Sequence, residues 1–352
     1  MLPSHLLSET VQLTDGAQVL ILNSAANPFV RAAAKQPGIG SIVLAEDNIA
    51  ALQSVQTALE QEHGYLSPGQ GPSRQGIYHT PFHKYISMQP PATIDVAVMD
   101  LLYQPGNAWM DYGLRVALYA LRPGGSLYVV GAKDRGVLSI AKRMQAYFGN
   151  IETLSIGKGQ RVVRSLKEAG QRHDAMLPDD TSPLVPAGFA SGKLDEGTRL
   201  LLEALEVHTT DAALDIGCGS GFIGIHIARL ARKGSVTMVD ASLAAVDAAQ
   251  QNVEQSGLQN IVVLPSNGAQ AVSAQRFDLV VTNPPFHLGG IQTTQLAKRF
   301  IREAAQVLRP RGCFYLVANR FLKYEPALRA CFKLVEEVSG NTRYKVLRAA
   351  QS

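Results

Sequence analysis

Residues 212–221 read AALDIGCGSG, an apolar run that passes directly into a turn rich in glycine. A helical pattern of apolar residues begins immediately after it, from Phe222 to Leu230. A short apolar run bounded by glycines is typical of a buried strand, and glycine lets the backbone approach a ligand closely. The helix that follows offers unpaired N–H groups in its first turn. The stretch therefore predicts an α/β sheet with a ligand-binding loop at the end of one strand.

The spacing of the glycines distinguishes two kinds of cofactor loop. Dinucleotide-binding loops have the pattern G-x-G-x-x-G, but Phe222 occupies the position of the last glycine, which disfavours a nicotinamide dehydrogenase. Gly217, Gly219 and Gly221 match G-x-G-x-G instead, and Asp215 stands two residues ahead of them. This loop resembles the S-adenosylmethionine loop of class I methyltransferases.

The next predicted strand ends in an acidic residue. The apolar run Val236–Val239 is followed by Asp240, nineteen residues after Gly221. An acid at the end of the second strand is placed to accept hydrogen bonds from both hydroxyls of a ribose. Helix capping is the alternative role for Asp215 and Asp240. For Cys218 we favour a small residue that fills a tight turn, and a nucleophile is the alternative.

An amide, two prolines and an aromatic ring follow another predicted strand. The apolar run Phe277–Thr282 leads into Asn283–Phe286, which reads NPPF, and then into His287. The prolines end the hydrogen-bonding ladder and fix the backbone. An Asn oxygen and a backbone C=O can each accept one hydrogen from a planar NH2 group, while a ring stacks on its plane. The tetrad therefore predicts a site for an exocyclic amine or an amide, and an ordinary Pro-Pro turn is the alternative.

The two halves of the chain repeat the same series of apolar blocks. Four blocks of the first half precede their counterparts by 194, 194, 183 and 187 residues, in one order. The pairs are 18–22 with 212–216, 41–46 with 235–240, 95–99 with 278–282, and 121–130 with 308–317. We therefore predict two copies of one strand–helix–strand domain. Residues 166–186 hold three prolines and one glycine among polar residues, and they read as a linker between domains 1–165 and 187–352.

The first copy lacks the residues that suggest chemistry in the second. Ile21 replaces the acid before the loop, residues 23–27 (NSAAN) replace the glycines, and residues 100–103 (DLLY) replace the tetrad. Only Glu46 preserves an acid, opposite Asp240. Because Cβ atoms in the loop block a close approach of the backbone to a ligand, we predict that the first copy binds no cofactor. It would serve folding or substrate docking.

The composition is that of a globular chain with a basic C-terminal region. The chain has 352 residues, of which 46% are hydrophobic, and a formal net charge of +4. No apolar run is long enough for a membrane span, and the first residues lack a signal-peptide pattern. The three cysteines are few and unpaired in pattern, which fits a reducing cytoplasm, and they show no metal-site spacing, so we predict no metal site. Residues 298–348 hold twelve Lys or Arg against four acidic residues, which suggests RNA or DNA as partner, with ordinary solvated helix charges as the alternative.

With these residues, the chain resembles the two-domain bacterial ribosomal RNA guanine-N2 methyltransferases. These are the small-subunit methyltransferase C group and its large-subunit relative, methyltransferase G. The resemblance covers almost all of the second half, through Leu214–Gly221, Asn283–His287, Leu316–Asn319 and Arg343–Ala349. The string NPPFH is quite specific to this group. The first half and the linker match the group in layout more than in residues, so the resemblance only favours 16S over 23S rRNA.

The resemblance implies a seven-stranded class I methyltransferase fold in each half, with S-adenosylmethionine bound only in the second. The loop residues would border the methionine end of the cofactor, Asp240 would hold the ribose, and Asn267 would lie near the adenine. The implied cofactor-binding residues are Asp215, Gly217, Gly219, Gly221, Asp240, Asn267 and Asn283.

The predicted reaction is methyl transfer to the N2 amine of a guanine in ribosomal RNA. Asn283 and the carbonyl of Pro284 would accept the hydrogens of the amine, and Phe286 would stack on an unpaired or extruded base. His287 would hydrogen-bond the base or a phosphate, with a structural cap as its alternative, while the alternative for Phe286 is core packing. Rival substrates for the same tetrad are adenine N6, cytosine N4 and a protein glutamine. A non-catalytic RNA-binding scaffold is the rival of another class.

Further substrate contacts are expected around the tetrad. Phe189 and Asp195 match a segment that helps to close the site in the family, although Ala190 stands where the small-subunit group often has Ser. Asp195 or Thr198 is also placed to cap the following helix. Candidates at the end of the strand 314–319 are Asn319, Arg320 and Lys323, the last two as phosphate contacts. The expected partner is ribosomal RNA or a ribosomal subunit, and a monomer is favoured.

Overall fold

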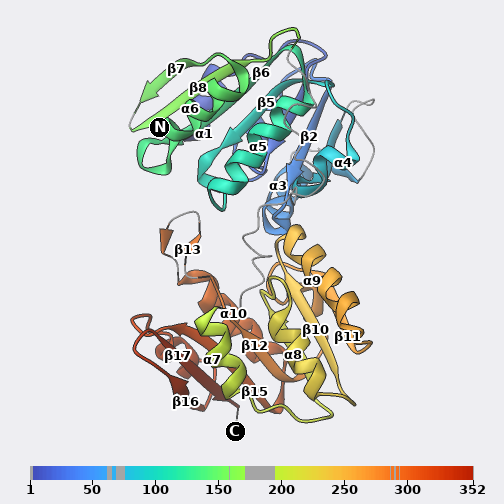
Figure 1. Ribbon diagram of the computed structural model, residues 1–352, viewed down its shortest axis with the longest axis vertical. Coiled ribbons are helices and arrows are strands. Elements are labelled where there is room, and N and C mark those ends of the chain that lie inside the picture. Colours follow the sequence, from blue (N-terminus) through green and yellow to red (C-terminus); the bar gives the residue numbers. More distant parts are fainter. Residues whose placement is uncertain are drawn as a thin grey trace. The chain divides into compact units, whose positions relative to one another are not determined.

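The computed structural model divides into two compact units, Met1–Ala187 and Gly188–Ser352 (Figure 1). The structure describes residues 3–61, 66–68, 76–157, 159–170, 195–285, 287–288, 291–292 and 294–351. Each unit has its own mixed β-sheet covered by helices. Because most of the predicted linker lies outside the described residues, the exact boundaries 1–165 and 187–352 stay predictions.

The second unit contains a seven-stranded sheet. Its strand order is β11-β10-β9-β12-β15-β17-β16, in which β17 is antiparallel to both neighbours and the other pairs are parallel. The strands are β9 (Ala212–Ile216), β10 (Ser235–Asp240), β11 (Ile261–Pro265), β12 (Phe277–Thr282), β15 (Leu308–Asn319), β16 (Leu334–Gly340) and β17 (Tyr344–Ala350). A separate hairpin joins β13 (His287–Leu288) to β14 (Ile291–Gln292). The helices are α7 (Glu196–Ala204), α8 (Phe222–Leu230), α9 (Leu243–Ser256), α10 (Gln295–Val307) and α11 (Glu325–Arg329), with a 3-10 turn at Gln270–Val272.

Both faces of this sheet are apolar, which explains why helices cover both. Along β12, Leu279 and Val281 pack with residues of α7, α8 and α9, while Val280 packs with residues of α10 and α11 on the opposite face. Successive residues of a strand point to opposite faces. A strand covered on both faces therefore reads as a continuous apolar run, as β12 does in the sequence.

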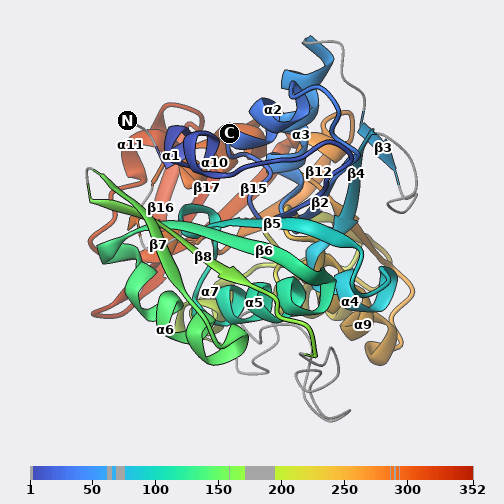
Figure 2. The ribbon, with the colours of Figure 1, turned by 90° about the horizontal axis from the view of Figure 1, so that it is seen from above.

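The first unit repeats this topology. Its strand order is β3-β4-β2-β1-β5-β6-β8-β7, with β8 antiparallel to both neighbours. The strands are β1 (Gln18–Leu22), β2 (Ser41–Glu46), β3 (Leu66–Pro68), β4 (Gly76–Pro81), β5 (Ile94–Asp100), β6 (Leu121–Ala132), β7 (Glu152–Gly157) and β8 (Gln160–Leu166). The helices are α1 (Pro3–Thr10), α2 (Phe29–Ala34), α3 (Ile49–Gln61), α4 (Tyr85–Met88), α5 (Asn107–Ala120) and α6 (Val137–Phe148), with 3-10 turns at Phe82–Lys84, Leu101–Tyr103 and Lys133–Arg135. Figure 2 shows α1, α2 and α3 on one side of this sheet and α5 and α6 on the other.

The duplication predicted from the sequence is confirmed. The four paired blocks are β1 and β9, β2 and β10, β5 and β12, and β6 and β15, and each pair occupies the same place in its sheet. The first sheet has one strand more than the expected seven, because the short β3 pairs in parallel with β4 beyond the last counterpart. The two units are therefore tandem copies of one fold.

In the first unit, side chains occupy the space around the loop that corresponds to the glycine loop. Asn23 adopts a left-handed conformation with φ 46°, and the N–H of Ala25 donates to Glu46 Oε2 at 2.8 Å. Asn27 Nδ2 donates to Asp100 Oδ2 at 2.7 Å, and Gln104 Nε2 donates to Ser24 Oγ and to three backbone carbonyls. All these side chains are buried. Buried side chains of the first unit thus form the hydrogen bonds of this loop.

Burial of Glu46 makes the stability of the first unit depend on pH. Burial raises the pKa of Glu46 to about 7, although the hydrogen bonds that it accepts from the N–H groups of Asn48 and Ala25 lower it. The folded state therefore holds a proton that the unfolded state has lost, so this stabilisation is full below pH 4.5 and is lost as the pH rises through 7. The free energy of unfolding of Glu46→Gln minus that of the wild type is expected to be roughly 2 kcal/mol larger at pH 8 than at pH 5. Urea unfolding of both proteins at the two pH values measures this difference, and an equal gap at both would contradict it.

Candidate active site

The predicted site residues of the second unit meet at one edge of its sheet. The strand order reverses between β9 and β12, where open α/β sheets bind ligands at the carboxyl ends of the strands. The glycine loop follows β9, and Asp240 ends β10. Asn267 follows β11, Asn283 follows β12, and Asn319 ends β15. Because these strands are parallel, all of these residues lie at the same edge.

The glycine loop has a backbone that other residues adopt only under strain. Gly217, Gly219 and Gly221 have φ values of 75°, 55° and 85°. A Cβ on Gly221 would approach the Cε of Met238 to 3.0 Å. The N–H of Gly217 donates to the Val239 carbonyl at 2.8 Å and anchors the start of the loop to β10. The loop is therefore held open beside the N-terminus of α8, in the form that suits close contact with a ligand.

Asp240 connects the glycine loop to the second strand. Its Oδ2 accepts from the N–H of Gly219 at 2.9 Å, and its Oδ1 accepts from the N–H of Ser242 at 2.9 Å. A carboxylate offers about four acceptor sites, so it can fix the loop and also receive hydroxyl donors. Glu46 holds the N–H of Ala25 in the same way in the first unit. The acid at this strand end is therefore a shared structural element, and only in the second unit does it face glycines.

Asp215 is a buried acid with an unused acceptor. Its Oδ2 accepts from the N–H of Gly224 at 3.1 Å, whereas its buried Oδ1 has no hydrogen-bond partner among the described residues. Burial, together with the nearby charge of Asp240, raises the pKa of Asp215 to about 7. A cationic or N–H-bearing group would satisfy the carboxylate and favour its charged form. The amine of S-adenosylmethionine is such a group, so the glycine loop and Asp215 fit this cofactor.

Cys218 lies within the same loop, and burial raises the pKa of its thiol well above the usual range. The side chain is 7% exposed and packs in the cluster that contains Ile223 and Met238. A thiol with a raised pKa is protonated at neutral pH and is a poor nucleophile. These features support the interpretation of Cys218 as a small residue that fills a tight turn.

The amide of Asn283 is held by α7. Its Nδ2 donates to Thr198 Oγ1 at 2.8 Å and to Asp195 Oδ2 at 3.3 Å. The hydroxyl of Thr198 donates its own hydrogen to Asp195 Oδ2 at 2.6 Å, so Thr198 Oγ1 can only accept from the amide. Asn283 Oδ1 has no hydrogen-bond partner within the described part of the chain. The contacts therefore fix which way the amide faces.

Asp195 and not Thr198 caps α7. The side chain of Asp195 accepts from the N–H of Thr198 at 2.9 Å, as an N-cap residue does. The contact of Thr198 with Asn283 joins residues 85 positions apart. Both residues are capping candidates in the sequence, but a capping pattern gives no information about a partner on a distant strand, so the contact with Asn283 could not be predicted. At the end of β12, Thr282 Oγ1 donates to the Ile216 carbonyl at 2.7 Å and ties the tetrad to β9.

Some predicted substrate contacts are not tested by the structure. Phe189 and Phe286 lie outside the described residues. His287 begins β13, and only its backbone is described. Lys323 is exposed, and Asn319 is half-buried at the end of β15. The roles of these residues in binding RNA stay predictions.

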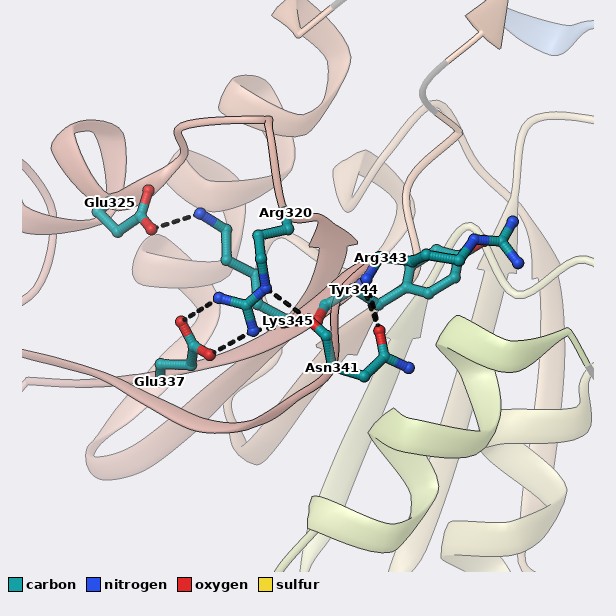
Figure 3. A network of polar contacts seen from close by, with 7 residues as sticks. All are labelled: Arg320, Glu325, Glu337, Asn341, Arg343, Tyr344 and Lys345. Carbon is teal, nitrogen blue, oxygen red and sulfur yellow. Dashed lines mark hydrogen bonds and ion pairs between the residues drawn. The ribbon is translucent and has the colours of Figure 1, made fainter.

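Arg320 forms structural hydrogen bonds within the second unit that the sequence did not indicate. Its guanidinium donates to both carboxylate oxygens of Glu337, at 2.7 and 3.3 Å, and to the carbonyls of Asn341 and Tyr344 (Figure 3). Four of the five N–H groups of an arginine side chain are thus used within the chain. These contacts hold the hairpin between β16 and β17, and a contact of Arg320 with phosphates stays a prediction.

No cluster of three or more His, Cys, Asp or Glu side chains among the described residues is arranged to hold a metal ion. Within the same residues, no helix is long and apolar enough to cross a membrane.

Comparisons with known proteins agree with this site. Residues 184–348 match the family model of the methyltransferase small domain. The ribosomal RNA small subunit methyltransferase C of Hahella chejuensis is 34% identical over 254 residues, which cover 69% of this chain and 74% of that protein. The protein of the same name from Escherichia coli is 33% identical over 273 residues, which cover 72% of this chain and 76% of that protein.

A solved structure matches nearly the whole length of the chain. It is the Thermus thermophilus 16S rRNA N2 G1207 methyltransferase, RsmC, in complex with AdoMet and guanosine. The match has a TM-score of 0.77 and 28% sequence identity, and it covers 99% of this chain and 91% of that one. Together with the glycine loop and the NPPF tetrad, these matches show that the chain belongs to the ribosomal RNA small subunit methyltransferase C family.

Proposed function

We propose that this chain transfers a methyl group from S-adenosylmethionine to the exocyclic N2 amine of a guanine in 16S ribosomal RNA. The relatives named above support the small subunit as the source of the substrate, and the RsmC complex supports guanine. The observation that carries the proposal is the Asn283 amide, whose NH2 group is engaged by Thr198 and Asp195. Its oxygen is left to accept a hydrogen from a planar amine beside the glycine loop.

The site acts by placing acceptors where the amine rehybridises. The lone pair of the guanine N2 amine is delocalised into the ring, so the amine is a poor nucleophile. Asn283 Oδ1 and the Pro284 carbonyl would each accept a hydrogen bond from one N–H of the amine. These bonds would localise the lone pair and direct it at the methyl group. S-adenosylmethionine supplies that methyl group on a sulfonium that is already activated. As the N–C bond forms the C–S bond would break, so the thioether S-adenosylhomocysteine leaves and the amine loses one proton to solvent. Positioning by the rigid Pro-Pro turn therefore accounts for most of the rate.

The remaining candidates would hold the cofactor and the base. Asp215 and the glycine loop would receive the methionine end of S-adenosylmethionine, Asp240 the ribose, and Asn267 the adenine. Phe286 would stack on the guanine. The first unit would bind no cofactor, since its own side chains satisfy the corresponding loop, and it would serve folding or docking on RNA.

Removal of one hydroxyl tests how the amide is oriented. Thr198→Val keeps the shape of the side chain and the backbone N–H that completes the cap of α7, but it removes the oxygen that accepts from Asn283. The amide can then rotate, and we expect kcat to fall roughly tenfold. Thr198→Ser keeps the hydroxyl and is expected to stay near the wild-type rate. Single-turnover methyl transfer measures the rates, and equal rates for the Val and Ser variants would exclude this role.

The proposed function is tested by mapping the methylated base. Both rRNAs, free and in assembled subunits, are incubated with the protein and labelled S-adenosylmethionine, and the nucleosides are identified by mass. N2-methylguanosine in 16S rRNA is the expected product. Label in 23S rRNA, or on adenine N6, cytosine N4 or a protein glutamine, would assign the site to one of the rival substrates. If no methyl group is transferred in a single turnover, the result would favour the non-catalytic RNA-binding scaffold.

A further inference from the structure

An exposed aromatic ring lies next to the proposed active site. Phe321 is the second residue after β15 and is 61% exposed, whereas its neighbours Leu322 and Tyr324 are buried. Leu316 of β15 pairs with Thr282, the residue before Asn283. Phe321 is five residues beyond Leu316, so it lies within about 20 Å of the tetrad at the same edge of the sheet. Most of the surface of this ring is therefore open to a ligand.

Phe321 lines a surface hollow of about 450 Å³ together with Asn319, Arg320, Thr342 and Arg343. The side chain of Arg343 is 69% exposed, and its guanidinium lies over the ring of Tyr344 at 5.5 Å. Arg343 also pairs with Glu196 of α7 at 3.1 Å. The hollow therefore combines an aromatic face with a cationic group, the two features that bind single-stranded nucleic acid.

The backbone around the hollow is fixed in advance. The N–H of Arg320 donates to the Arg343 carbonyl at 2.8 Å, which joins the turn after β15 to the β16–β17 hairpin. Asn341 Oδ1 accepts from the N–H groups of Arg343 and Tyr344, both at 2.8 Å. Figure 3 shows these residues as one network with Glu337. A rigid frame lowers the entropy lost when a ligand binds.

We propose that this hollow binds an unpaired nucleotide of the RNA substrate that flanks the target guanine, with its base stacked on Phe321. The proposal rests on the proposed function and adds a second base-binding position to it. A stacked ring accepts any base, so the subsite fixes the path of the strand and not its sequence. Arg343 faces the same strand as a contact for its phosphates. Residues 298–348 as a whole hold twelve Lys or Arg against four acidic residues, and this excess of positive charge favours an RNA ligand.

Substitutions at Phe321 separate stacking from simple apolar contact. Phe321→Leu keeps an apolar side chain without a ring, and we expect it to weaken binding of a 16S rRNA fragment that contains the target guanine roughly tenfold. Phe321→Tyr keeps the ring and is expected to bind as the wild type does. Val262→Ala is the matched control, because Val262 is also apolar and 54% exposed but lies on β11 at the far edge of the sheet. Affinities are measured by fluorescence anisotropy at one salt concentration.

The outcomes distinguish this subsite from the proposed function itself. If the wild type transfers methyl groups to RNA and Phe321→Leu binds the fragment as tightly as Phe321→Tyr, the subsite is disproved. The same holds if Phe321→Leu weakens binding to the assembled subunit only, since the ring would then contact a ribosomal protein. If the wild type transfers no methyl group to any RNA, the proposed function fails. A thermal midpoint within error of the wild type is required for every variant, and the exposed position of Phe321 makes this the expected result.

Discussion

Asn283→Ala is expected to lower kcat for RNA methylation roughly a thousandfold, while the affinity for S-adenosylmethionine stays near that of the wild type. The loss of one preorganised group that stabilises a transition state costs about 3–4 kcal/mol, and this cost appears in kcat. Asn283 would act in this way because its oxygen accepts from an amine whose hydrogen bonds strengthen as the lone pair localises. Rapid-quench single turnovers measure the chemical step, and calorimetry measures the affinity for the cofactor. An equal loss of affinity and rate would show that Asn283 supports the fold of the site instead.

Asn283→Asp is the informative companion variant. It keeps an oxygen acceptor at the same place, but a carboxylate cannot donate to Thr198 and lies against the carboxylate of Asp195, which contacts the native amide at 3.3 Å. We therefore expect a loss of rate close to that of the alanine variant. A rate near the wild type would mean that any oxygen suffices there, and that the contact with α7 is not required.

The sequence predicted the repeated fold because its evidence lies in continuous blocks. Strands covered on both faces read as apolar runs, and four such runs recur at nearly constant spacing. The short β3 (Leu66–Pro68) was not predicted, since its three residues have no periodicity that marks a strand. The strand ends that carry Asp215, Asp240 and Asn283 followed directly from the ends of the runs.

Contacts between distant segments were beyond the reach of the sequence. The local pattern marks Thr198 only as a candidate cap, and its contact with Asn283 forms because the fold brings the first turn of α7 to the end of β12. The sequence presents Arg320 as a candidate phosphate contact, and it does not reveal the ion pair with Glu337, which forms because the β16–β17 hairpin brings the two side chains together. A sequence gives the charge and type of each residue, but it does not show which distant residue forms hydrogen bonds with a given side chain.

Asp240→Ala is expected to weaken the binding of S-adenosylmethionine roughly a hundredfold. Asp240 would accept hydrogen bonds from the ribose hydroxyls, and hydrogen bonds to a charged group contribute about 1.5–3 kcal/mol each. Its carboxylate also fixes the glycine loop through the N–H of Gly219, so its removal loosens the loop as well. Both effects act on the cofactor and not on the amide at Asn283. At saturating cofactor the single-turnover rate is therefore expected to recover most of its wild-type value.

Glu46 provides the matched control, because it occupies the same strand end of the first unit and accepts from the N–H of Ala25. Calorimetry of the wild type is expected to show one cofactor per chain, and Glu46→Gln is expected to leave both the stoichiometry and the affinity unchanged. The loop beside Glu46 has no glycine, and buried polar side chains such as Asn27 and Gln104 satisfy its neighbourhood. Two cofactors per chain, or an affinity that falls in Glu46→Gln, would show that the first unit still binds S-adenosylmethionine. The acid at this strand end would then bind the cofactor in both units. In our interpretation it anchors the loop in both units and binds the cofactor only in the second, where the loop contains glycines.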